Sequence, residues 1–286
     1  MEVGNVKLKK ITTWCFLLVF IGVNVCLAQY DRRERQDRIK PFPWPERKQC
    51  AVSLTFDDAR LSQIDAGIPL LNQYKIKATF YISPESLKRR IDGWKAAVEV
   101  GHEIGNHTMN HPCSGNFAFA RAKALEEYTL DRIEEEMDGA NQFIFENLGV
   151  NAINFAYPCG QSFVGRGEKL QSYIPLVAKK FMTGRGWMGE DSNDPWYCDF
   201  AQLFGMESDG KSFDELRQLI DKAKKERRWL VLAGHEIGER GRQTTLVSSL
   251  EKLCQYANNP ENGIWIDTVA AVAEHIQKVR AQAETQ

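Results

Sequence analysis

Residues 51–60 read AVSLTFDDAR, so an apolar run ends in two neighbouring acids, Asp57 and Asp58. The run at 51–56 combines apolar and β-branched residues and is typical of a buried strand. Adjacent carboxylates repel each other, so the pair is either an acidic turn or helix cap, or part of a site that holds a cation. The remainder of the chain has to decide between these two interpretations.

Similar apolar runs recur along the chain and alternate with helical patterns. Strands are predicted at 78–83, 102–107, 153–158, 229–235 and 263–268, and helices at 94–101, 119–148, 168–180, 212–226, 245–257 and 268–279. Such alternation predicts parallel β-α units. A count of about seven or eight strands fits a barrel better than an open sheet. We therefore predict a single α/β barrel.

The first 28 residues have the pattern of a secretory signal peptide, with lysines before an apolar run at 14–28 that ends in small residues. The run is shorter than the roughly 20 residues that a membrane-spanning helix needs. We therefore expect cleavage after Ala28 and an exported protein, periplasmic or secreted, without a stable membrane span. A retained anchor and a lipid on Cys26 are the alternatives.

Residues 29–48 are charged and proline-rich, and we interpret them as a lead-in to a catalytic domain at 49–286. Five cysteines follow residue 28, so at least one is unpaired or pairs with another chain, and the sequence does not determine the pairing. The net charge of −1 indicates no nucleic-acid partner. The oligomeric state is not indicated.

Most of the histidines lie at or just before the ends of predicted strands, where parallel barrels carry their chemistry. They are His102, His107, His111 and His235. His102 stands within its strand and is expected to be structural, and His275, on the last helix, has no such context. His235 is either a buried core histidine or a functional one.

His107 and His111 stand four residues apart, so two imidazoles can share one cation. The spacing alone is a weak signal, and Pro112 places the pair on a short turn or loop. One acid of the 57–58 pair completes a set of two histidines and one carboxylate, which is the ligand type of a catalytic Zn²⁺ or related divalent site. The other acid then stays free as a base.

The stretches TFDD, GHEIGNHTMNH, a strand ending in Pro-x-Gly and an apolar strand ending in His together resemble the polysaccharide deacetylase family. This family is carbohydrate esterase family 4, with the NodB homology domain, and the resemblance covers roughly residues 48–280. It implies a distorted (β/α)7 barrel and one divalent metal ion, with Zn²⁺ the expected ion. It also implies hydrolysis of N-acetyl or O-acetyl groups on an acetylated glycan.

Carried over position by position, the resemblance implies that Asp57 is the catalytic base and that His235 is the general acid. The metal ligands that it implies are Asp58, His107 and His111. The backbone N–H of Cys159 matches the family's oxyanion contact. Tyr157 beside it is predicted to line the substrate site. Trp187 is predicted either to stack on a sugar face or to pack in the core.

Two departures from the family pattern leave gaps in this interpretation. Ala156 stands where the family often has an arginine that orients the base, and Cys159 replaces the usual tyrosine. Arg185 is predicted to replace the missing arginine; the alternative is a surface arginine beside a glycine-rich loop. The acid that supports His235 is not determined, and the candidates are Asp191, Asp194 and Asp199.

The sequence thus predicts an exported, metal-dependent carbohydrate deacetylase that acts on an acetylated glycan. One alternative keeps the site and changes the substrate to a non-sugar amide or imide. Another is a glycan-binding protein that retains the fold without activity. The sequence does not indicate which glycan is bound, or whether amide or ester bonds are cleaved.

Overall fold

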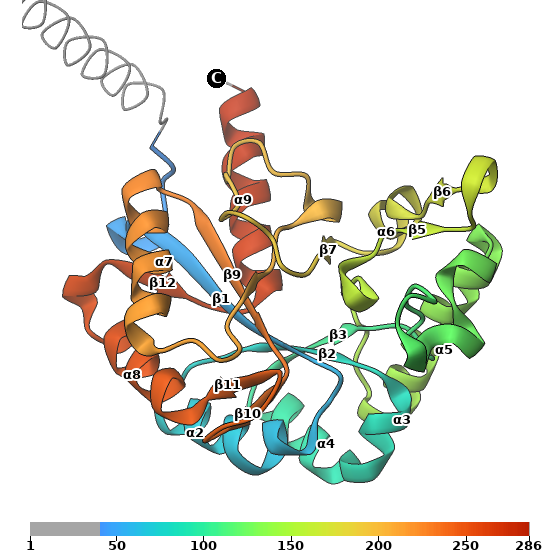
Figure 1. Cartoon of the computed structure of the whole chain (residues 1–286). Helices are drawn as coiled ribbons and strands as arrows, with labels where there is room; N and C mark the ends of the chain where they lie inside the picture. The colour runs from blue at the N-terminus through green and yellow to red at the C-terminus, as the bar shows by residue number, and fades with distance from the viewer. Residues whose placement is uncertain (1–40, 286) are drawn as a thin grey trace, which may run out of the picture. The chain divides into compact units, whose positions relative to one another are not determined.

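The computed structural model describes residues 41–285, and its compact unit begins at Phe42 (Figure 1). The signal peptide, the alternative lipid site at Cys26 and most of the lead-in lie outside the described residues. Phe42 and Trp44, at the end of the lead-in, are buried against the last helix, so these residues pack with the domain. Among the described residues, no helix has the length and apolar character that crossing a membrane requires.

The central sheet of this unit is parallel, and its strands follow one another as in a barrel. In spatial order they are β7 (Thr183–Arg185), β4 (Asn154–Ala156), β3 (Glu103–Asn106), β2 (Thr79–Ile82), β1 (Cys50–Asp57), β9 (Trp229–Gly234) and β8 (Met206–Glu207). The two ends of this row meet, because Leu203, just before β8, pairs in parallel with Arg185 of β7. The single predicted α/β barrel is therefore present.

The barrel is distorted at the beginning of β1. There β12 (Ile264–Ile266) pairs with Cys50–Val52, whereas β2 pairs only with Thr55–Asp57. Two short ribbons lie outside the main sheet: β5 (Phe163–Val164) with β6 (Gln171–Ser172), and β10 (Glu236–Gly238) with β11 (Thr244–Leu246). The second ribbon follows β9 directly.

Helices connect and cover the strands (Figure 1). They are α2 (Ile68–Gln73), α3 (Pro84–Leu87), α4 (Ile91–Glu99), α5 (Leu130–Leu148), α6 (Ile174–Lys180), α7 (Phe213–Glu226), α8 (Val247–Asn258) and α9 (Val269–Glu284). The side chains of β1 explain the layering. Val52, Leu54 and Phe56 pack with apolar helix residues such as Trp94 and Leu253, and the residues between them face the barrel interior.

Two predicted helices are shorter than expected, because a helix cap shortens the first and a short strand shortens the second. The helix predicted at 119–148 begins only at Leu130, where the side chain of Thr129 accepts a hydrogen bond from the N–H of Arg132. It ends at Gly149, whose φ of 72° is the left-handed conformation that favours glycine. The helix predicted at 168–180 begins only at Ile174, because residues 171–172 form β6.

The end of the barrel opposite the strand carboxyl ends is closed by polar side chains and by the start of α9. The N–H of Val269 donates to the hydroxyl of Thr79 at 2.9 Å, and the N–H of Ala270 donates to the carboxylate of Glu103 at 3.0 Å. Thr79 also donates to Glu103 at 2.7 Å. The positive end of the helix dipole therefore faces a buried carboxyl group.

Candidate active site

The two acids of the 57–58 pair occupy different places because the backbone turns between them. Ser53, Thr55 and Asp57 alternate with the apolar residues of β1 and are buried inside the barrel. Asp58 follows the last residue of the strand and has a φ of 73°, where non-glycine residues are uncommon. The turn lets two consecutive side chains face one cavity instead of opposite sides of the sheet.

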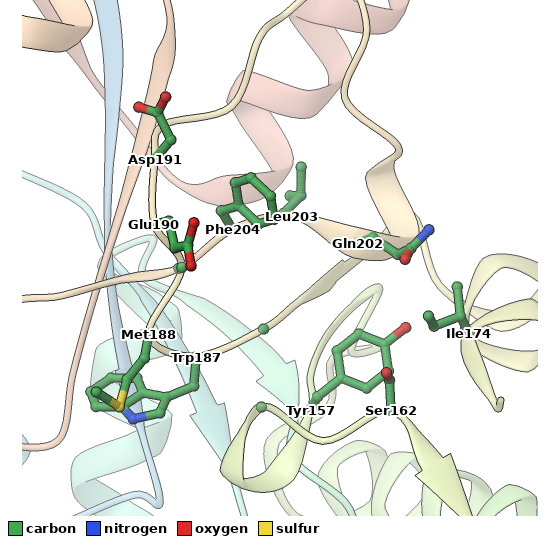
Figure 2. A pocket seen from close by; sticks show the side chains of 14 residues that line it. Tyr157, Ser162, Ile174, Trp187, Met188, Glu190, Asp191, Gln202, Leu203 and Phe204 are labelled. Carbon is green, nitrogen blue, oxygen red and sulfur yellow. The ribbon is translucent and has the colours of Figure 1, made fainter. Parts of the chain in front are cut away.

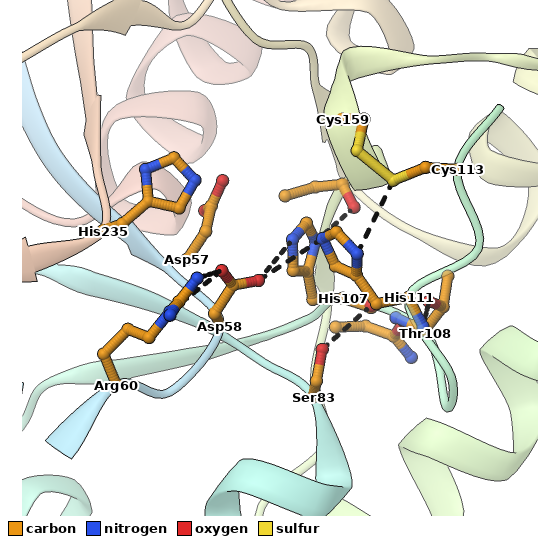
Figure 3. A network of polar contacts seen from close by, with 12 residues as sticks. Asp57, Asp58, Arg60, Ser83, His107, Thr108, His111, Cys113, Cys159 and His235 are labelled. Atoms are coloured by element: carbon orange, nitrogen blue, oxygen red, sulfur yellow. Dashed lines mark hydrogen bonds and ion pairs between the residues drawn. A yellow bond between two sulfur atoms is a disulfide. The ribbon is translucent and has the colours of Figure 1, made fainter. Parts of the chain in front are cut away.

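Asp58, His107 and His111 converge at the carboxyl ends of β1 and β3 (Figure 3). Oδ1 of Asp58 lies 3.5 Å from Nε2 of His107 and 3.3 Å from Nε2 of His111. The three ligand atoms lie within 4.8 Å of one another, so a single ion can reach all of them. The other oxygen of Asp58, Oδ2, accepts a hydrogen bond from Nη2 of Arg60 at 2.8 Å, which orients the carboxylate.

Both imidazoles of this group present a lone pair. Nδ1 of His107 lies 2.8 Å from the carbonyl oxygen of Ala156. A carbonyl oxygen can only accept, so Nδ1 carries the proton and Nε2 is free to bind a metal. Burial and the neighbouring His107 lower the pKa of His111 to about 4, so that its ring is neutral at pH 7. Neutral imidazoles are the form that metal ligation requires.

Asp57 forms a buried ion pair with Arg185, which comes from the opposite part of the barrel. The two side chains are 5% and 1% exposed. Burial by itself raises the pKa of Asp57, but the guanidinium of Arg185 and the nearby imidazoles outweigh it and hold the pKa below its usual value. Arg185 also donates from Nη1 to the carbonyl of Gly186 at 2.7 Å, and its guanidinium lies 4.9 Å from the ring centre of Tyr81.

The sheet register explains how Arg185 reaches this place. Ala156 of β4 is the direct partner of Arg185 on β7. Paired residues on adjacent strands point to the same side of a sheet, so both positions face Asp57 from neighbouring strands. Arg185 is therefore a buried residue, and the alternative of a surface arginine is wrong.

His235 follows β9 and is held by an aspartate that sequence reasoning missed. Nδ1 of His235 lies 2.8 Å from Oδ2 of Asp209, and the other oxygen of Asp209 accepts from Thr245 at 2.9 Å. Burial by itself lowers the pKa of His235, but its bond to Asp209 and the nearby acids outweigh it and raise the pKa. The ring of Trp187 meets His235 edge to face, with centroids 4.6 Å apart.

The three aspartates considered as partners of His235 have other roles. Asp191 pairs with Lys222 and Arg228, and Asp194 and Asp199 accept hydrogen bonds from nearby backbone N–H groups. The missed Asp209 stands two residues after β8, at the carboxyl end of a strand. Like the histidines of the site, this residue lies at the end of a strand. The sequence did not indicate it, because β8 has only two residues and produces no apolar run.

One cavity of about 570 Å³ collects these groups. Besides Asp57, Asp58, His107, His111 and His235, its lining includes Arg60, Phe117, Phe119, Cys159, Trp187, Arg242 and Gln243. Cys159 has a φ of 54°, and its backbone N–H has no hydrogen-bond acceptor among the described residues. A buried or half-buried N–H without an acceptor is available to a bound oxyanion.

A disulfide joins Cys159 to Cys113 and thereby ties two loops of this cavity together (Figure 3). Cys113 stands two residues after His111. His111, Cys113 and Cys159 lie close enough to form a second metal-ligand group, but both sulfurs are committed to the disulfide. The remaining cysteines among residues 41–285 are free thiols, namely Cys50, Cys198 and Cys254.

A second cavity of about 450 Å³ shares Trp187 with the first (Figure 2). Tyr157 lines this second cavity, and its hydroxyl donates to the carbonyl of Ala201 at 2.7 Å. The structure therefore does not bring Tyr157 to the metal-ligand group, and its place at the substrate stays a prediction. His102 is structural as expected, since its Nδ1 accepts from the N–H of Ala78 at 3.2 Å.

The sequence model of the family described as polysaccharide deacetylase matches residues 45–170, which include Asp57, Asp58, His107 and His111. This stretch is less than half of the chain, and over it the sequence is similar to the polysaccharide deacetylase family. His235 and Arg185 lie beyond the matched residues, so their place in the site rests on the geometry of the barrel.

Curated relatives match parts of the chain. A peptidoglycan-N-acetylglucosamine deacetylase of Bacillus cereus is 39% identical over 81 residues, which is 28% of this chain and 37% of that protein. The uncharacterized protein YlxY of Bacillus subtilis is 32% identical over 124 residues, or 43% of this chain and 33% of that one. The chain thus spans about a third of the length of these relatives.

Solved structures share the fold over most of the chain. A putative polysaccharide deacetylase from Mycobacterium smegmatis has a TM-score of 0.60 at 16% identity, covering 85% of this chain and 94% of that one. A carbohydrate esterase family 4 pseudoenzyme from Bacillus anthracis has a TM-score of 0.51 at 17% identity, covering 84% and 71%. These likenesses confirm the predicted (β/α)7 barrel. Because they include a pseudoenzyme, the fold alone does not decide activity.

Proposed function

We propose that this chain is an exported, metal-dependent hydrolase that removes acetyl groups from a carbohydrate. The single observation that supports it most is the cavity in which a two-histidine, one-carboxylate group faces the buried Asp57–Arg185 pair and the Asp209–His235 pair. Two buried pairs aimed at one cavity are more simply explained by catalysis.

The ligand group fits a divalent cation. Ligands about 2.0–2.2 Å from a tetrahedral ion lie about 3.3–3.6 Å from one another. The measured separations from Asp58 to the two imidazoles, 3.5 and 3.3 Å, match this edge length. Three protein ligands leave open coordination positions on the cavity side, as in catalytic zinc sites. A cation bound there would polarise an acetyl carbonyl and acidify water in the cavity.

Asp57 is the base in this proposal. Its ion pair with Arg185 keeps the carboxylate ionised in a buried position, so it can accept a proton from an attacking water molecule. The side chain of Gln63 donates to the backbone carbonyl groups of Asp57 and His235 at 2.7 and 2.8 Å. It therefore holds the ends of β1 and β9, and with them the base and the acid, at a constant spacing.

His235 is the acid, because Asp209 keeps its Nδ1 protonated and the raised pKa favours a charged ring. A charged imidazole can deliver a proton from Nε2 to the departing amine or alkoxide of the sugar. The free N–H of Cys159 lies on the same cavity and supports the oxyanion that forms during attack. Trp187 packs against the imidazole and restricts its rotation.

The proposal is tested by metal analysis and by release of acetate from acetylated chitooligosaccharide and acetylated xylan. We expect about one divalent ion per chain and acetate release from one of the glycans. An Asp57→Asn variant retains the ion and loses turnover, whereas Asp92→Asn, an exposed acid on α4, leaves both unchanged. Absence of bound metal contradicts the enzymatic proposal. Bound metal without acetate release favours a non-sugar amide substrate or a binding protein.

A further inference from the structure

The loop that follows the metal ligand His111 carries two exposed aromatic rings into the same cavity. Phe117 and Phe119, which we call the aromatic pair, are 44% and 66% exposed. Their ring centroids are 5.5 Å apart and their planes differ by 23°, so the rings stack. Both side chains line the cavity that contains Asp58, His111 and His235.

The fold does not use the aromatic pair. Neither ring belongs to the hydrophobic clusters of the described residues. Burying a phenylalanine side chain stabilises a protein by roughly 1.5–3 kcal/mol, and these two rings do not obtain that gain from the core. Exposed apolar groups that gather beside a polar, functional cavity are typical of a binding surface.

The loop that presents the pair is fixed at its base. The disulfide joins Cys113 to Cys159, and the N–H of Ser114 donates to the side chain of Gln161 at 2.7 Å. The N–H of Gly115 donates to Glu126 at 2.9 Å, and the N–H of Phe117 donates to the carbonyl of Ser114 at 3.0 Å. A ligand that stacks on the pair therefore does not have to order the loop first.

The chemistry of the cavity identifies the ligand. An aromatic face attracts polarised C–H groups, and a pyranose ring presents such groups on one face and hydroxyl groups around its edge. Arg242 and Gln243, both exposed, line the same cavity and supply hydrogen-bond donors for those hydroxyl groups. A flat apolar ligand would match the pair but leave these polar groups without partners.

Building on the proposed function, we infer that the aromatic pair stacks on a pyranose ring that neighbours the acetylated one. The site then recognises a chain of sugars and not a single acetylated sugar. Because the pair is separate from the metal ligands and from the Asp57 and His235 pairs, it contributes to binding of a long substrate and leaves the chemistry of a small acetyl ester unchanged.

Calorimetry on the metal-free chain measures binding without turnover, with N-acetylated chitopentaose and O-acetylated xylopentaose as probes. We expect the wild-type chain to bind one of the two, and a Phe117→Ala/Phe119→Ala variant to bind it about tenfold more weakly. Affinity for N-acetylglucosamine and hydrolysis of a small aryl acetate by the metal-loaded variant stay within about twofold. Phe119→Ala alone, the milder change, gives a smaller loss in the same direction.

Phe145→Ala is the matched control, since this ring is 50% exposed on α5 and does not line the cavity. Equal pentasaccharide affinity in wild type and double variant overturns the inference, and so does a wild-type chain that binds neither probe. Parallel loss of metal and of aryl acetate hydrolysis also overturns it, because the pair then only supports the loop of His111. Intact binding without acetate release from any glycan contradicts the proposed function and leaves this inference standing.

Discussion

Replacing Arg185 by methionine separates the charge of this side chain from its volume. Arg185 and Asp57 are 1% and 5% exposed, so the variant leaves a buried carboxylate without its partner. Removing one member of a buried pair costs about 3–5 kcal/mol. That is a large part of the roughly 5–15 kcal/mol by which a domain is usually stable, so we expect a folded but clearly destabilised protein.

The cost depends on pH in a direction that follows from the lowered pKa of Asp57. With Arg185 present, the pair contributes stability above the usual pKa of 3.8, and this contribution is lost as the pH falls through the folded-state pKa. Without Arg185, burial raises the pKa of Asp57, and protonation relieves the unpaired charge. The difference in unfolding free energy between wild type and variant is therefore greatest near pH 7 and shrinks toward pH 4.

Two measurements check this prediction. Denaturant unfolding of the metal-free protein, followed by tryptophan fluorescence at several pH values, gives the difference in unfolding free energy. The pH dependence of kcat/KM for the metal-loaded protein gives the ionisation of the base. We expect the acid limb of the Arg185→Met variant to move to higher pH, because Asp57 must be ionised to accept a proton.

The sheet register suggests a second variant that restores the charge beside Asp57. Ala156 pairs directly with Arg185, so an Ala156→Arg/Arg185→Ala variant moves the guanidinium to the neighbouring strand on the same side of the sheet. We expect it to restore the position of the acid limb. A Met variant that is equally destabilised at every pH and keeps the wild-type acid limb would show that Arg185 only fills space, and would refute the proposed support of the base.

Further predictions concern the other supports of the site. Asp209→Asn removes the main group that raises the pKa of His235, so the alkaline limb of kcat/KM moves to lower pH; an unchanged limb speaks against His235 as the acid. Changing Cys113 and Cys159 to serine frees the loop of His111, and we expect weaker metal binding by competition with a chelator and slower acetate release. Metal affinity equal to that of wild type would limit the disulfide to global stability.

The barrel could be predicted from the sequence because its central strands are long buried runs. β1 and β9 have only buried residues. Asp57 and Asp58 stand at the end of β1, and His235 follows β9, so these candidate residues were visible in the sequence. The helix boundaries near 119–129 could not be predicted, because a single threonine cap and a pair of short 3₁₀ turns replace the expected helical turns. Local hydrogen bonds determine these helix boundaries, and the spacing of apolar residues gives no information about such bonds.

Some residues of the candidate site could likewise be predicted from the sequence, and others could not. The metal-ligand group could be predicted from the spacing of His107 and His111 and from the position of Asp58 after an apolar run. Both are features of short stretches of sequence. Asp209 depends on a two-residue strand, and the Cys113–Cys159 pairing depends on two loops that meet only in the folded barrel. The contact between Arg185 and Asp57 depends on which residue of β7 lies opposite Ala156. Pairings between distant segments require the register, which the sequence does not supply.

The closure of the barrel by α9 has a consequence for the order in which the protein is completed. Thr79 and Glu103, encoded in the first half of the chain, receive N–H groups from Val269 and Ala270, close to its end. A nascent chain that stops before residue 268 leaves this end of the barrel open to water and a buried carboxyl group without its donors. The barrel is therefore closed at this end only after residues 269 and 270 have been made, so its folding cannot be completed from the strands alone.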